Sequence, residues 1–167
     1  MYRKIEDFVS AWETESAATQ KLLDAIDDRS LEQPVLKGHR TLARIAWHIV
    51  TTVSEMMAKT GLAITSVSPD APVPGKASEI QRAYASVASE LLKQIKTNWT
   101  DQTLTIEDEM YGEKWPRGKS ARILIDHQTH HRGQLTVLMR QAGLKVPGVY
   151  GPSKEEWAGY GAPPPEI

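Results

Sequence analysis

Cysteine is absent from this 167-residue sequence, and several kinds of chemistry are excluded with it. A chain without thiols forms no disulfide, no zinc–thiolate site and no iron–sulfur cluster, and it supplies no cysteine nucleophile. Any metal ion bound by this chain must therefore take its ligands from His, Asp or Glu.

An excess of one charge and long hydrophobic runs are also lacking. Twenty Lys and Arg residues stand against 21 Asp and Glu residues, which leaves a formal charge of −1. No overall positive field attracts nucleic acid or an anionic membrane. No apolar run is long enough to span a bilayer, and residues 1–7 lack the apolar core of a signal peptide. We therefore expect a cytoplasmic protein with neither a nucleic-acid partner nor a membrane partner.

The length of the chain and the placement of its prolines indicate one helical domain. A mass of 18.6 kDa with 40% hydrophobic residues suits a single domain, 1–167, with its own core. Proline is disfavoured inside helices, and apolar residues recur at three- and four-residue intervals in the windows that lack it. The predicted helices are 3–27, 41–60, 78–98 and 120–142.

Polar residues mark where three of these helices are expected to begin. Thr41 is a suitable N-cap for the second helix. Ser78, followed three residues later by Gln81, matches a capping box at the start of the third. The fourth is expected to begin at Ser120 and to end before a glycine.

Four amphipathic helices with little alternating pattern predict an all-α four-helix bundle. The connection 61–77 could extend roughly 50 Å, whereas a twenty-residue helix is about 30 Å long. The second and third helices therefore need not be antiparallel. Residues 103–107 alternate and predict one extended ribbon. The tail 144–167 carries apolar residues and is expected to pack on the bundle.

Two histidines fall on the apolar face of the predicted fourth helix. His127 and His131 lie about 40° apart on it. Burying a polar group without a partner costs about 1–3 kcal/mol, so the pair is either two hydrogen-bonded core residues or two ligands of one metal ion. His48, at the flank of the second helix, is the best third ligand. Three neutral imidazoles leave a position open on a divalent ion, which is typical of catalytic sites.

Three other polar side chains are weaker candidates. His39 precedes the second helix and is expected to be solvated or to cap it. His130 points about 80° away from the other two histidines of its helix and can pair with Asp126. Glu55 could be a further ligand or a general base, although an exposed carboxylate is the ordinary interpretation.

Two common metal-site motifs are excluded. Zinc proteases of the His-Glu-x-x-His type need a glutamate after the first histidine, and here Gln128 follows His127. Di-iron bundles need Glu-x-x-His pairs, and no glutamate stands three residues before any histidine. A single-metal site of three histidines is left.

These motifs resemble the DinB/YfiT-like family. His48 is followed about eighty residues later by 127–135, which reads His-Gln-Thr-His-His-Arg-Gly-Gln-Leu, and segments 142–147 and 150–153 are also similar. The resemblance covers nearly the whole chain. It implies an up-down-down-up bundle, commonly a homodimer, with one divalent metal ion such as zinc or nickel held by His48, His127 and His131.

The resemblance also implies a class of reaction. Relatives in the superfamily include thiol-dependent S-transferases and a mycothiol-dependent maleylpyruvate isomerase. We expect a metal-dependent transfer of an external low-molecular-weight thiol to small electrophiles. A metal-dependent hydrolase and a non-catalytic metal-binding or structural dimer are the alternatives. No residue is matched to a catalytic or substrate-binding role, and Arg132 and Gln134 could equally serve helix packing or contact substrate.

Overall fold

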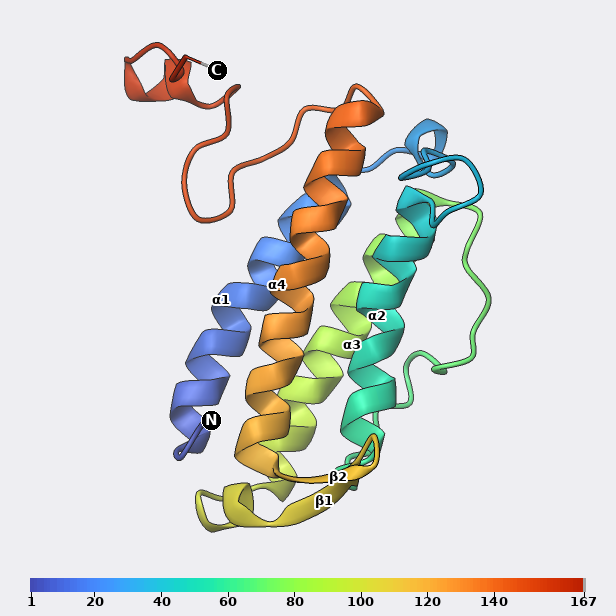
Figure 1. Ribbon diagram of the computed structural model, residues 1–167. Helices are drawn as coiled ribbons and strands as arrows, with labels where there is room; N and C mark the ends of the chain where they lie inside the picture. The colour runs from blue at the N-terminus through green and yellow to red at the C-terminus, as the bar shows by residue number, and fades with distance from the viewer. Residues whose placement is uncertain (167) are drawn as a thin grey trace.

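Four long helices form the body of the structure, a computed structural model that describes residues 1–166 (Figure 1). Both α1 and α2 pack against α3 and against α4. The predicted helical class is therefore confirmed, with a small two-stranded sheet added to it. No helix among the described residues has the length and apolarity needed to cross a membrane. The helices are α1 (Ile5–Asp24), α2 (Leu42–Ala58), α3 (Ala77–Asn98) and α4 (Arg117–Gln141).

The connection between α2 and α3 runs along the outside of the bundle (Figure 1). The indole Nε1–H of Trp47 in α2 donates to the carbonyl of Ala71 at 2.8 Å. The carboxylate of Glu90 in α3 accepts from the backbone N–H groups of Thr65 and Ser66 at 3.0 and 2.8 Å. These bonds hold an irregular segment against both helices that it joins.

The helix starts differ from the sequence prediction in one instructive case. Thr41 caps α2 as predicted, because its hydroxyl accepts from the backbone N–H of Arg44 at 3.2 Å. The prediction of a capping box at Ser78 was wrong, since α3 already begins at Ala77. The N–H of Ala77 instead donates to Asp28 Oδ1 at 2.8 Å. Asp28 lies in the short 3₁₀ helix η1 (Asp28–Ser30), so the cap comes from a distant part of the chain.

The first and last helices also differ from their predicted bounds. α1 covers 5–24 within the predicted 3–27. α4 begins at Arg117, three residues before the predicted start, and Ser120 is buried in its first turn. Arg117 donates to the carboxylate of Asp108 at 2.9 and 3.2 Å, which joins the start of α4 to the preceding hairpin.

That hairpin replaces the predicted ribbon at 103–107. Residues Gln102–Thr105 form the 3₁₀ helix η2, and the chain then makes β1 (Glu107–Met110) and β2 (Glu113–Pro116). The strands are antiparallel, with Met110 opposite Glu113. Between them Tyr111 and Gly112 have φ values of 56° and 85°, the two positive values that a tight hairpin turn requires. The extended structure therefore starts later than the alternating residues suggested.

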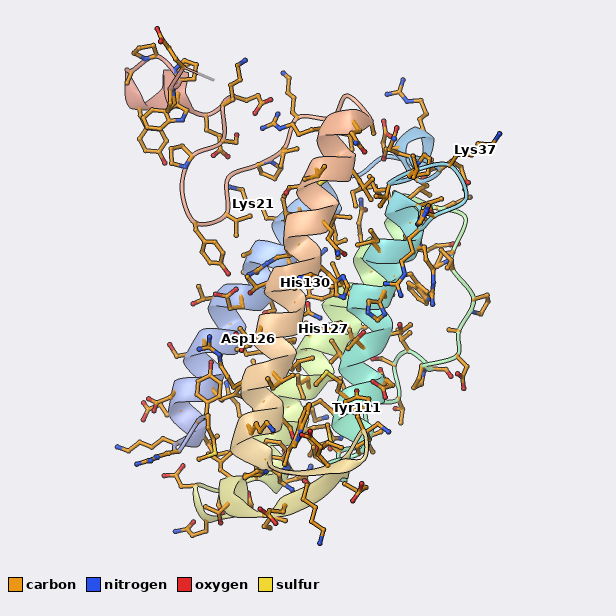
Figure 2. All side chains as sticks on the ribbon, viewed as in Figure 1. Lys21, Lys37, Tyr111, Asp126, His127 and His130 are labelled. Carbon is orange, nitrogen blue, oxygen red and sulfur yellow. The ribbon has the colours of Figure 1, made fainter. Side chains whose placement is uncertain are left out.

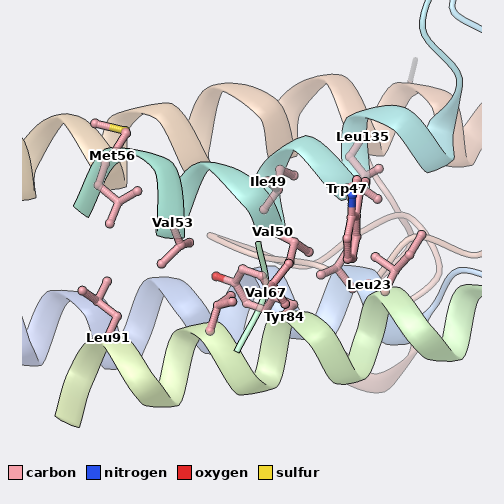
Figure 3. Packing of buried hydrophobic residues seen from close by; sticks show 14 of the residues in the cluster. Leu23, Trp47, Ile49, Val50, Val53, Met56, Val67, Tyr84, Leu91 and Leu135 are labelled. Atoms are coloured by element: carbon pink, nitrogen blue, oxygen red, sulfur yellow. The ribbon is translucent and has the colours of Figure 1, made fainter. Parts of the chain in front are cut away.

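The core lies between the helices and contains one polar link that fixes their register. Aliphatic side chains of α2, α3 and α4 interdigitate around Tyr84, whose ring is fully buried (Figure 3). Each fully buried aliphatic side chain contributes about 1.5–3 kcal/mol. The Tyr84 hydroxyl donates to Gln128 Oε1 at 3.1 Å, and Gln128 Nε2 donates to the carbonyl of Ile49 at 2.9 Å. This link sets α4 against α2 beside His48 and His127.

The tail packs on the bundle over only part of the predicted range. Val146 is buried and Val149 lies against the core, whereas Tyr160 is 71% exposed. Figure 1 shows the short helix η3 (Trp157–Tyr160) standing away from the bundle. Trp157 and Tyr160 contact each other, with ring centroids 6.4 Å apart. Residue 167 of the predicted range lies outside the described residues.

Candidate metal centre

Three histidines from two helices meet between α2 and α4. His48 lies in the middle of α2, and His127 and His131 lie one turn apart on α4. His127 Nε2 is 3.2 Å from His48 Nε2 and 3.1 Å from His131 Nε2. Figure 2 shows His127 on α4 beside α2. The structure thus brings together the three histidines that the sequence analysis selected.

Hydrogen bonds fix the ring orientation of two of these histidines. His131 Nδ1 lies 2.8 Å from the amide oxygen of Gln134, an acceptor, so Nδ1 carries the hydrogen and Nε2 has a free lone pair. The Thr52 hydroxyl donates to the carbonyl of His48 at 2.6 Å. Its oxygen can therefore accept from His48 Nδ1, 3.4 Å away, which again leaves Nε2 with the lone pair. Both lone pairs face His127.

The nitrogens of His127 fit a shared cation. Its Nδ1 is buried and has no hydrogen-bond partner among the described residues. A single proton on its Nε2 cannot satisfy both facing lone pairs with good geometry. A cation between the three rings would accept one lone pair from the Nε2 atom of each histidine. Zinc bonds imidazole nitrogen at about 2.0–2.1 Å, so ligand nitrogens in a tetrahedral site stand about 3.3–3.4 Å apart, slightly more than the 3.2 and 3.1 Å found here. The donor set therefore fits a divalent metal ion.

The surroundings keep these imidazoles neutral. Burial, with smaller contributions from the charges of neighbouring histidines and of Arg40, lowers the pKa of His48 and of His127 from an ordinary value near 6.5 to about 4. Burial also lowers the pKa of His131, while its hydrogen bond to Gln134 acts in the opposite direction. Neutral imidazole is the form that binds metal. At pH 7 the three lone pairs are therefore available.

The weaker candidates lie elsewhere. Glu55 accepts from the Tyr111 hydroxyl at 2.6 Å and belongs to the hairpin end of α2, outside the histidine group. The expected pairing of His130 with Asp126 was wrong. Asp126 accepts from Arg122 at 2.8 Å, because arginine reaches it from the preceding turn. His130 Nε2 instead lies 3.1 Å from Gln134 Nε2.

Three residues gain places in the structure that the sequence left open or missed. Gln134 orients His131, and it also borders a cavity of about 470 Å³ beside the histidines. Arg132 packs away from this cavity, against α1, where it bonds Glu15. Arg40 was missed, although it lines the same cavity. The available signal was its position one residue before the N-cap of the helix that carries His48.

Comparison with known proteins places the chain in a family. The model of the DinB family matches residues 1–166. The chain is 44% identical over 167 residues to the uncharacterized protein YrdA of Bacillus subtilis (strain 168), with all of both chains covered. Among solved structures it is similar to a DinB-like protein from Bacillus cereus ATCC 10987, with 45% identity and a TM-score of 0.87. That match covers 90% of this chain and 100% of the other.

A more distant structure shows the same fold at lower identity. The DinB-like protein YjoA of Bacillus subtilis is 20% identical, with a TM-score of 0.67, over 86% of this chain and 96% of that one. The helical fold is thus shared beyond the range of obvious sequence similarity. The whole-chain family match and the two relatives near 45% identity lead to one conclusion: this chain belongs to the DinB family.

Proposed function

We propose that this protein is a divalent-metal-dependent enzyme whose ligands are His48, His127 and His131. The observation that carries the proposal is the convergence of three neutral Nε2 atoms on one point. No carboxylate among the described residues joins the group. Three imidazoles leave at least one position of a zinc or nickel ion open to a reactant.

The reaction we propose is transfer of an external low-molecular-weight thiol to a small electrophile. A divalent ion bound by three imidazoles stabilises a thiolate near neutral pH. The chain holds the imidazoles neutral by burial, and Gln134 and Thr52 fix the rings of His131 and His48. In the transfer the thiol proton leaves to solvent. A sulfur–carbon bond forms, and the bond from that carbon to the leaving group breaks with its electron pair.

The absence of a nearby carboxylate favours thiol over water as the nucleophile. A thiol has an ordinary pKa near 8.5 and ionises readily beside a cation. Water is a much weaker acid, and metallohydrolases commonly add a glutamate as general base. Here the carboxylate of Glu55 is bonded to Tyr111 and lies outside the histidine group. The site therefore suits a reactant that loses its proton with the help of a metal ion alone, without a general base.

The proposal extends to the assembly and to the connectivity of the bundle. We propose an up-down-down-up order of helices, which the course of residues 59–76 along the bundle supports (Figure 1). We also propose a homodimer, as the family resemblance suggests. Light scattering coupled to gel filtration tests it, and a mass near the 18.6 kDa of one chain would contradict it.

Consumption of a thiol together with an electrophile tests the function. The zinc- or nickel-loaded protein is incubated with chlorodinitrobenzene and a panel of low-molecular-weight thiols, and both reactants are measured. We expect equal consumption of thiol and electrophile with the loaded protein, and only the background rate with metal-free protein or with His127→Ala. Loss of electrophile without loss of thiol would indicate a hydrolase. No acceleration with any thiol at full metal loading would leave a non-catalytic metal-binding protein.

A further inference from the structure

The cavity lies near the histidines, and the side chain of Gln134 joins the two. It has a volume of about 470 Å³ and lies between α4 and the loop that precedes α2. Gln134 forms part of its wall and bonds His131. Ile45, another part of the wall, stands three residues before His48 on α2. A molecule in this cavity would therefore lie next to the candidate metal centre.

The cavity carries positive charge and no opposing acid. Arg40 lines it, and no aspartate or glutamate does so. Within residues 1–166 the guanidinium of Arg40 forms neither an ion pair nor a hydrogen bond that meets ordinary distance limits. A free guanidinium at this place is suited to a carboxylate, which it can bind through two parallel hydrogen bonds.

The nearby start of α2 does not offer a competing anion site. Its first backbone donors are already bonded: Leu42 to the carbonyl of Gln33 at 2.8 Å and Ala43 to that of Leu31 at 3.0 Å. The next donor, Arg44, bonds the hydroxyl of Thr41. An anion in this cavity therefore finds no free backbone donor at the start of α2, and the guanidinium of Arg40 is the strongest donor in the lining.

Part of the remaining wall is apolar and open to solvent, and His39, Gln134 and Gln141 add polar groups to it. Val35 in the loop is 51% exposed, and Val137 on α4 is 57% exposed. Together with Ile45 they offer hydrophobic contact to a ligand body that lies between Arg40 and the histidines. The lining thus combines the guanidinium of Arg40 with aliphatic and polar surface, which matches an amphipathic small molecule.

We propose that this cavity binds a reactant with a short apolar body and a carboxylate, and that Arg40 pairs with the carboxylate. The identification of the occupant as a reactant rests on the proposed function, whereas the Arg40–carboxylate contact does not. The carboxylate belongs either to the thiol or to the electrophile. Arg40 is a binding residue in this scheme and takes no part in bond making.

Calorimetric binding of two matched pairs of probes tests the proposal on the cobalt-loaded full chain. The first pair is ω-mercaptohexanoate and its neutral counterpart ω-mercaptohexanol. The second is hexanoate and hexanol, titrated with mercaptoethanol present. We expect the carboxylate of at least one pair to bind about tenfold more tightly than its neutral counterpart, as a charge-assisted contact predicts. The pair that shows this preference identifies the reactant that bears the carboxylate.

Two variants distinguish a direct contact between Arg40 and the carboxylate from the overall electrostatic field of the protein. Arg40→Gln should abolish the preference and leave binding of the neutral probes unchanged. Lys37→Gln removes the same charge from the same loop, but Lys37 points away from the bundle in Figure 2 and should retain the preference. The proposal is overturned if neither pair shows a preference in the wild type. A preference that survives Arg40→Gln, or that Lys37→Gln abolishes equally, also overturns it.

The absorption spectrum of the bound cobalt tests the proposed thiol chemistry separately from the binding of carboxylate by Arg40. A cobalt–thiolate band should accompany binding of either thiol probe. If no band appears, the proposed thiol chemistry fails. The calorimetric preference for carboxylate and its dependence on Arg40 still decide the present inference in that case.

Discussion

α4 carries two clusters of buried and half-buried polar side chains on different sides, and they are built in opposite ways. Toward α1, Arg132 is 2% exposed and ends among oxygen acceptors. Its Nη1 donates to the carbonyl of Glu15 at 2.7 Å and to Thr19 Oγ1 at 3.3 Å. Its Nη2 donates to the Glu15 carboxylate and to Thr129 Oγ1. The Tyr150 hydroxyl also donates to Glu15, so this cluster contains its own counter-charge.

Toward α2, the histidine cluster contains no counter-charge. His48, His127 and His131 present their Nε2 atoms to one another, and the Nδ1 of His127 has no partner among the described residues. Desolvated acceptors that face each other are unfavourable unless something binds them. The difference teaches that burial alone does not mark a functional group. The cluster around Arg132 stabilises the fold, whereas the donor set of the histidines fits a cation from outside.

Removal of one histidine should give the largest effect, on metal binding. After chelation and reloading, elemental analysis should find about one metal ion per wild-type chain and close to none in His127→Ala, because the central ligand is lost. His39→Ala, which removes a histidine outside the cluster, should bind as the wild type does. Equal loading of wild type and His127→Ala would refute the site.

Disruption of the cluster around Arg132 should lower the stability of the fold without loss of metal binding. Glu15→Gln leaves the buried guanidinium of Arg132 without a charge partner, which should cost about 3 kcal/mol in the free energy of unfolding. Urea denaturation measures this cost. Glu13→Gln, on the same helix, breaks only the exposed pair with Lys96 and should cost less than about 1 kcal/mol. Metal loss in Glu15→Gln at native pH would show that the clusters are not independent.

Acid should weaken the metal-free fold through the histidines. The pKa of His48 and of His127 is about 4 in the folded chain and about 6.5 when unfolded. Between these values the unfolded chain binds more protons, so stability is present above about pH 6.5 and is lost as pH falls toward 4. Thermal melts should show Tm falling by several degrees across this window.

Two variants show which groups cause the fall of Tm between pH 6.5 and 4. His127→Ala should flatten the decline of Tm, because one of the depressed groups is gone. Glu15→Gln should lower Tm at every pH and keep the slope. An unchanged slope in His127→Ala would show that other groups cause the acid sensitivity.

Periodic patterns explain how much of this structure the sequence could predict. The helices and the grouping of His48, His127 and His131 follow from three- and four-residue spacing together with the family resemblance. The cap on Ala77 could not be predicted, because Asp28 reaches it across 49 residues of chain. β1 was misplaced because it reads Glu-Asp-Glu-Met, which lacks the alternation of a half-buried strand.

Side-chain partners were the other part that spacing could not supply. Arg132 directly follows His131 in sequence, but only the packing of α1 supplies its partner Glu15. Arg40 is unremarkable until the loop before α2 lies against α4 and forms a cavity. Sequence therefore identified the groups that could bind a metal ion, while tertiary contacts decided which charges were already neutralised.

Gln134 gives the smallest effect and tests how the histidine cluster is held. Its amide oxygen accepts from His131 Nδ1, so Gln134→Ala frees the ring and should weaken metal affinity about tenfold. Gln134→Glu keeps an acceptor and should retain the affinity. Gln141→Ala changes the same cavity without touching a histidine and should also retain it. Nitrogen NMR of His131 reads the Nδ1–H tautomer directly. If Gln134→Ala keeps both the tautomer and the affinity, then packing between α2 and α4 orients the ring.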